Sequence, residues 1–173
     1  MRIIQIFFGQ IPGHLQACVS SVISYAQTNN FEYGQITRIP SRFKEPQFKS
    51  PKEKFLWRRH ISDWVRTKEL SVTAGTFYVD WDVYIYPDFI IKDLTRPCFG
   101  RGETTDCLMY NGNALEIFKE FNSEIETPSV LPTYNLSRLI DEYCGKNPGQ
   151  QTYEGHCCHL DNCRFFNCYD LYD

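Results

Sequence analysis

Residues 77–83 read Phe77-Tyr78-Val79-Asp80-Trp81-Asp82-Val83, so two aspartates interrupt an otherwise apolar and aromatic run. The β-branched and aromatic residues predict a buried strand over residues 77–85. Residues i and i+2 of a strand face the same side of the sheet. We therefore expect Asp80 and Asp82 to converge on one point, while Trp81 faces the other side.

Two carboxylates in such a strand need a cation, hydrogen bonds or water, because burying an unpaired charge is unfavourable. Two oxygen donors suit Mg²⁺ or Mn²⁺, which often bind one or two carboxylates together with phosphate oxygens and water. Pro87 ends the strand soon afterwards, so the pair is expected near its carboxyl end, where open α/β sheets bind ligands. The alternative is a pair of strand-end aspartates that backbone amides satisfy.

Patterns typical of strands and of helices alternate on both sides of this stretch. Apolar runs predict further strands over residues 3–8, 33–39 and 107–110. Helical spacing of apolar residues predicts helices over residues 15–28, 52–72, 114–121 and 134–143, with Gly75 as the C-cap of the second. This alternation predicts one α/β domain over residues 1–173, with a mostly parallel sheet.

Composition indicates a folded globular chain and excludes some classes of function. Hydrophobic residues make up 42% and aromatic residues 16% of the 173 residues, and disordered chains have fewer of both. The net charge of −3 argues against a nucleic-acid-binding protein. No apolar run approaches the roughly 20 residues of a membrane span, and the first strand is too short for a signal peptide. We expect no transmembrane segment and a cytoplasmic location.

The residues around the aspartate pair resemble the sugar-transferase region of glycosyltransferase family 32, which is related to the glucosyltransferase domains of large clostridial toxins. That family shows Ser-Asp-x-x-Arg, a Leu four residues on, a Gly-Gly turn and Tyr-Leu-Asp-x-Asp. The matching residues here are Ser62-Asp63-Trp64-Val65-Arg66, Leu70, Ala74-Gly75 and Tyr78-Val79-Asp80-Trp81-Asp82. The stretch Ile4-Gln5-Ile6-Phe7-Phe8-Gly9 is similar to the family's first strand. Three departures are Ala74 for the first glycine, the extra residue Thr76 and Phe7 for a tryptophan.

The resemblance implies a minimal GT-A type fold, Rossmann-like, with a mostly parallel central sheet flanked by helices. It also implies a metal-dependent hexosyltransferase. Such an enzyme moves a sugar from a UDP- or GDP-linked donor to a glycan, a glycoprotein or another hydroxyl acceptor, with retention of configuration. The implied cofactor is Mn²⁺ or Mg²⁺.

The resemblance also implies a role for each matched residue. Asp82 would ligate the metal, and Asp80 would hold the ribose and reach the metal through water or one oxygen. Asp63 and Arg66 would bind the donor sugar or its phosphate, and with the two aspartates they form the expected catalytic set. The expected donor-binding residues also include Phe7, which would stack on the base, and Phe8, Gly9, Tyr78 and Trp81.

The end of the sequence offers further ligands in Gly155-His156-Cys157-Cys158-His159. Related families take an additional metal ligand from this region, so His156 and then His159 are candidates. A structural zinc site formed by the two histidines with two of Cys157, Cys158, Cys163 and Cys168 is an alternative, although the spacing fits poorly. Free thiols and disulfides remain open for these cysteines.

Two other functions fit parts of the pattern. A phosphohydrolase of the haloacid-dehalogenase type also carries Asp-x-Asp after an apolar strand. Its motif normally has Thr or Val two residues after the second Asp, where this chain has Tyr84. The second alternative is a non-catalytic module that binds nucleotide sugars or carbohydrates.

Overall fold

A five-stranded sheet forms the centre of the computed structural model, which describes residues 1–91, 93–100, 107–125 and 136–146. The strand order is β2-β1-β3-β5-β4. Strand β1 pairs in parallel with β2 and with β3, whereas β5 runs antiparallel to both β3 and β4. The strands are β1 (Arg2–Ile6), β2 (Glu32–Ile36), β3 (Thr76–Val79), β4 (Cys98–Phe99) and β5 (Leu108–Tyr110).

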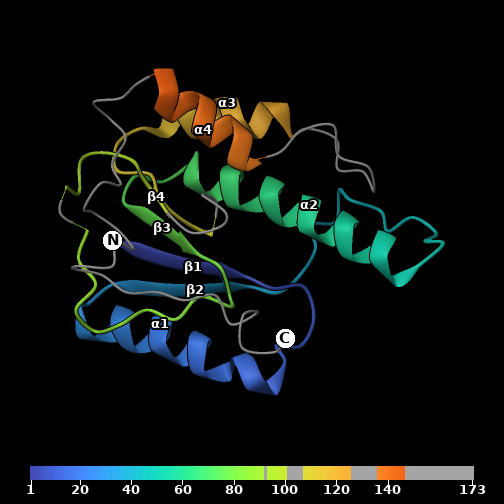
Figure 1. Cartoon of the computed structure of the whole chain (residues 1–173), viewed down its shortest axis with the longest axis horizontal. Coiled ribbons are helices and arrows are strands. Elements are labelled where there is room, and N and C mark those ends of the chain that lie inside the picture. The colour runs from blue at the N-terminus through green and yellow to red at the C-terminus, as the bar shows by residue number, and fades with distance from the viewer. Residues whose placement is uncertain (92, 101–106, 126–135, 147–173) are drawn as a thin grey trace.

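Helices cover both faces of this sheet, as Figure 1 shows. The 3-10 turn η1 (Gly13–Leu15) leads into α1 (Gln16–Thr28), which lies on one face; α2 (Pro51–Leu70), α3 (Leu115–Glu124) and α4 (Leu136–Lys146) lie on the other. The predicted α/β fold is therefore confirmed. No helix in the described part of the chain is long and apolar enough to cross a membrane.

Local chemistry explains the start of α2, the longest of these helices. The Ser50 side chain accepts a hydrogen bond from the Glu53 amide at 3.2 Å, and Pro51 occupies the first position. A serine cap followed by proline is a strong helix start. The serine side chain accepts a hydrogen bond from an amide that has no partner within the helix, and proline has no N–H to leave unpaired at the first position. The helix then packs Trp57, Ile61 and other buried side chains into the core.

Strand β3 is shorter than the sequence predicts: it ends at Val79, whereas the predicted strand continues to residue 85. The Asp80 amide still donates to the Cys107 carbonyl at 2.8 Å, but the Val83 amide donates back to the Asp80 carbonyl at 3.2 Å and closes a turn. Val83 and Ile85 are nevertheless buried. Asp80 and Asp82 thus lie in a turn beyond β3, so the strand alternation predicted for them was wrong.

Gly75 does not cap α2, which also corrects the sequence interpretation. Helix α2 ends at Leu70 with Ser71 as its C-cap. Gly75 lies four positions beyond Ser71, in the turn that leads into β3, where its φ is +71° and its amide donates to the Gly112 carbonyl at 3.0 Å. This left-handed conformation favours glycine, so Gly75 allows the tight turn that leads into β3.

Gly112 follows β5 at a position that admits no side chain. Its φ is +53°, and an added Cβ would lie 2.6 Å from the Arg96 carbonyl carbon. Gly112→Ala is therefore expected to lower the free energy of unfolding by about 2 to 4 kcal/mol, through backbone strain and overpacking. Urea denaturation measures the change. The control is Gly13→Ala, where nothing lies within 4 Å of the added Cβ; equal stability of both variants would contradict the prediction.

Four cysteines lie in the described residues, and all are buried: Cys18, Cys98, Cys107 and Cys144. Burial, and then the negative charge of Asp141, raises the pKa of the Cys144 thiol to about 11. The reactive form of a cysteine is its thiolate. Cys144 therefore stays protonated near neutral pH and acts as a core residue.

Candidate functional site

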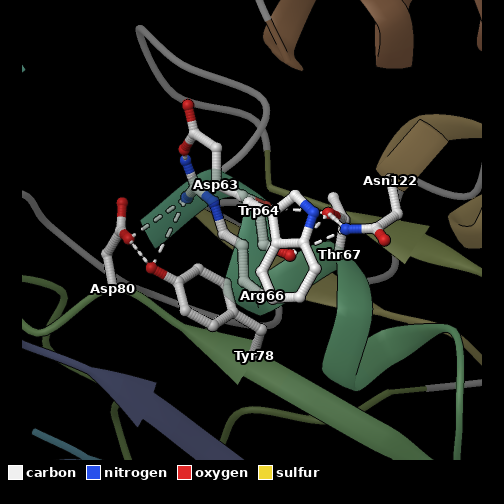
Figure 2. Close-up of polar contacts among 7 residues, drawn as sticks. All are labelled: Asp63, Trp64, Arg66, Thr67, Tyr78, Asp80 and Asn122. Atoms are coloured by element: carbon white, nitrogen blue, oxygen red, sulfur yellow. Dashed lines mark hydrogen bonds and ion pairs between the residues drawn. The ribbon is translucent and has the colours of Figure 1, made fainter. Parts of the chain in front are cut away.

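Four polar side chains from α2, β3 and the loop after β3 meet beside the sheet; we call Asp63, Arg66, Tyr78 and Asp80 the Arg66 cluster (Figure 2). Arg66 Nη2 donates to Asp63 Oδ1, and Arg66 Nη1 lies 3.4 Å from both Asp80 Oδ1 and Tyr78 Oη. The Tyr78 hydroxyl donates to the same oxygen of Asp80. Three of the predicted catalytic residues thus lie together, with Tyr78 joining them.

The cluster is buried on its α2 side and more open at Asp80. The side chain of Arg66 is 4% exposed and that of Asp63 is 11% exposed, whereas that of Asp80 is 25% exposed. The guanidinium also lies 5.1 Å from the centroid of the Tyr78 ring, a distance that allows a cation–π contact. A buried cation needs such partners, so Asp63, Tyr78 and Asp80 hold Arg66 in one place.

Helix α3 braces the turn of α2 that carries Asp63 and Arg66. Asn122 Nδ2 donates to the Trp64 carbonyl at 2.8 Å and to Thr67 Oγ1 at 2.9 Å. Thr67 Oγ1 in turn donates to the Asp63 carbonyl at 2.8 Å. Figure 2 shows this chain of contacts reaching from Asn122 to the cluster. Side chain–backbone bonds of this kind fix the helix turn and so the direction of its side chains.

The backbone of Asp80 is fixed from the opposite side by β1 and β2. Gln5 of β1 is fully buried and donates through Nε2 to the Asp80 carbonyl at 3.2 Å. The Tyr33 hydroxyl of β2 donates to Gln5 Oε1 at 2.9 Å. Burial raises the pKa of Tyr33, so its hydroxyl remains a donor at neutral pH. Three neighbouring strands therefore position the first aspartate of the pair.

The loop after β1 meets the turn after β3, since both leave the same edge of the parallel part of the sheet. The rings of Phe7 and Trp81 lie 4.7 Å apart at an interplanar angle of 59°. Phe8 packs against the core, and Gly9 is exposed with a φ of +135°. The structure thus brings together Phe7 and Trp81, two residues expected to bind the donor.

Arg58 of α2 also reaches this loop, although its sequence context gave it no role. Its Nη1 donates to the Phe8 carbonyl at 3.3 Å. In the sequence Arg58 stands in the basic run Arg58-Arg59-His60, which fits a solvated helix start better than phosphate binding and is assigned no role. The contact with Phe8, fifty positions earlier, and its partial burial distinguish Arg58 from the exposed Arg59.

Asp82 lies on the same turn as Asp80 and is 4% exposed. The described residues contain no group of three or more His, Cys, Asp or Glu side chains placed to hold a metal ion. His156, His159 and the cysteines from Cys157 to Cys168 lie outside the described residues. Metal binding by Asp80, Asp82 and a C-terminal histidine therefore stays a prediction.

Comparisons with known proteins agree with this fold. No protein-family model and no curated protein sequence matches the chain. Among solved structures, the chain is similar to the crystal structure of a glycosyltransferase involved in the glycosylation of the major capsid of PBCV-1. The TM-score is 0.53 at 17% identity, over 88% of this chain and 80% of that one. At this identity the likeness shows the fold, and membership of family 32 stays a prediction.

Proposed function

We propose that the chain is a metal-dependent glycosyltransferase that moves a sugar from a UDP- or GDP-linked donor to a hydroxyl of a glycan or glycoprotein, with retention of configuration. The Arg66 cluster carries the proposal, because it places Asp63, Arg66 and Asp80 together beside the carboxyl end of β3. The likeness in fold to a glycosyltransferase supports it. Fold alone does not define an activity, so the argument depends on these side chains.

The proposed donor extends along the sheet edge from β1 to β3. Phe7 and Trp81 offer aromatic surface for the base at the end of β1. Asp80, the most exposed acidic group of the Arg66 cluster, can accept hydrogen bonds from the ribose hydroxyls. Asp63 and Arg66 are held rigidly enough to orient the sugar or its phosphate, since α3 braces their turn. Fixed geometry of this kind lowers the entropic part of a reaction barrier.

The proposed cofactor is a divalent cation held by Asp80 and Asp82. Asp80 belongs to the Arg66 cluster, and Asp82 follows it by two residues on the same turn. Oxygen donors of this type suit Mn²⁺ or Mg²⁺, with Asp82 as the proposed direct ligand and Asp80 beside it. A bound divalent ion would supply charge neutralisation for the leaving diphosphate.

The residues of the chain then have separate tasks in the transfer. Asp80 and Asp82 hold the nucleotide end of the donor, while Arg66 can bind one phosphate or sugar oxygen through its planar fork of donors. The Tyr78 hydroxyl, which donates to Asp80, keeps that carboxylate oriented. The bond between the anomeric carbon and the diphosphate breaks, the acceptor hydroxyl forms the new glycosidic bond, and its proton passes to the leaving diphosphate.

The direct test is a binding screen of UDP-, GDP- and CMP-sugars, each with and without Mn²⁺, by calorimetry or thermal shift. We expect at least one nucleotide sugar to bind only when the metal is present, and to be hydrolysed slowly or transferred. Metal-dependent binding without hydrolysis or transfer would favour a non-catalytic binding module. If none of the nucleotide sugars binds, the proposed function is wrong.

A further inference from the structure

The side of α2 that faces the sheet carries two arginines, one for each neighbouring strand end. Arg66 contacts Tyr78 and Asp80 at the end of β3, whereas Arg58 contacts the Phe8 carbonyl just beyond β1. The two are eight residues apart, about 12 Å along the helix axis. In Figure 1 the N-terminal half of α2 lies toward the carboxyl ends of β1 and β2. Arg58 therefore lies at the Phe7 end of the site, away from the Arg66 cluster.

The hydrogen bonding of Arg58 is incomplete within the described residues. Its Nη1 has the long bond of 3.3 Å to Phe8, and its Nε is buried without a hydrogen-bond partner there. A buried donor without a partner is unfavourable, because it has lost its hydrogen bonds to water. Buried polar groups in native structures nearly always have a hydrogen-bond partner, so this donor side chain suits a ligand that supplies an acceptor. The local geometry thus leaves the guanidinium able to donate to a ligand beside Phe7.

The chemistry of that ligand follows from the guanidinium, which has five N–H donors and no acceptor. Among nucleobases, uracil and guanine present a carbonyl oxygen where cytosine and adenine present an amino group. A donor-only side chain pairs with the carbonyl and faces the amino group unfavourably. Sites built on such a hydrogen bond discriminate more strongly than apolar pockets do.

We propose that Arg58 is a specificity-determining residue that selects a keto nucleobase, uracil or guanine, in the nucleotide of the donor. The inference rests on the proposed function, because it places the base against Phe7. The bond to the Phe8 carbonyl fixes the guanidinium one residue beyond the aromatic ring that would support the base. Arg58 then donates to the base carbonyl, while the base stacks on Phe7.

Calorimetric titration of UDP and CDP in the presence of Mn²⁺ tests this role, because their pyrimidine bases differ at one exocyclic group. We expect the parent protein to bind UDP about tenfold more tightly than CDP, as one charged hydrogen bond implies. Arg58→Met keeps the length and packing of the side chain, and it should bring the two affinities to within about twofold of each other. Arg59→Met is the matched control, since Arg59 is the exposed neighbour, and it should keep the preference.

The outcomes separate this inference from the proposed function. Equal affinities of the parent for UDP and CDP would leave the transferase proposal standing and overturn the role of Arg58. If Arg58→Met lowers the affinities for UDP and CDP by the same factor, the role of Arg58 is also overturned. An effect on the position of the loop or on the general charge changes both affinities without changing their ratio. If neither nucleotide binds the parent with Mn²⁺, both the proposed function and the inference are wrong.

Discussion

Replacing Asp82 by asparagine is expected to weaken Mn²⁺-dependent binding of a nucleotide sugar by about a hundredfold or more, since it removes the proposed direct metal ligand. Asparagine has nearly the same shape, so the buried side chain, 4% exposed, keeps its packing. The parent should gain thermal stability when donor and Mn²⁺ are added together, because ligands that bind the native state stabilise it. The variant should show little of this gain. Thermal unfolding with and without each ligand measures the effect.

Asp88→Asn is the control for this experiment. Asp88 lies six residues further along the same loop region and is exposed, so its replacement makes the same chemical change outside the proposed site. The control should bind donor and metal as the parent does. If Asp82→Asn keeps the metal-dependent affinity of the parent, Asp82 is not the metal ligand and the proposed metal site is wrong.

Local sequence patterns predicted the part of the site that depends on short separations. Asp63 and Arg66 share a helix face because they are three residues apart, and their contact is observed. The helix periodicity also placed α2 correctly to within about two residues, and the apolar runs located β1, β2 and β5. Each of these features follows from the period of one element, so the sequence carries the information directly.

The loop after Val79 shows where this reasoning fails. Val83 and Ile85 read as strand residues because they are apolar, yet β3 ends at Val79 and both are buried beyond it. Hydrophobicity reports burial, whereas a strand requires backbone pairing at successive residues, and beyond Val79 the residue Val83 forms only an isolated bridge. The hydrogen bond from Val83 to Asp80 gives the backbone a turn instead. The two residues of β4 are likewise too short a pattern to recognise in advance.

Contacts between distant segments lay beyond prediction for a different reason. Arg58 meets Phe8 across fifty positions, and Asn122 meets Thr67 across fifty-five. No local pattern encodes such a pairing, because it arises only when α2 packs between the sheet and α3. Arg58 and Asn122, which contact the site from distant segments, are therefore residues to which the sequence pattern assigned no role.

Replacing Arg66 by methionine is expected to lower the free energy of unfolding by about 3–5 kcal/mol, because it leaves Asp63 and Asp80 without their shared cation. Arg2→Met provides the contrast: its ion pair with Glu69 is about 30% exposed on both sides, so the loss should be about 1 kcal/mol or less. Arg66→Lys restores the charge without the planar fork, and we expect it to recover most of the stability but little donor binding.

Urea denaturation and donor titration of the three variants measure both effects. Should Arg66→Met unfold no more easily than Arg2→Met, the buried cluster does not hold this part of the fold together; should Arg66→Lys bind donor as the parent does, the fork has no part in recognition.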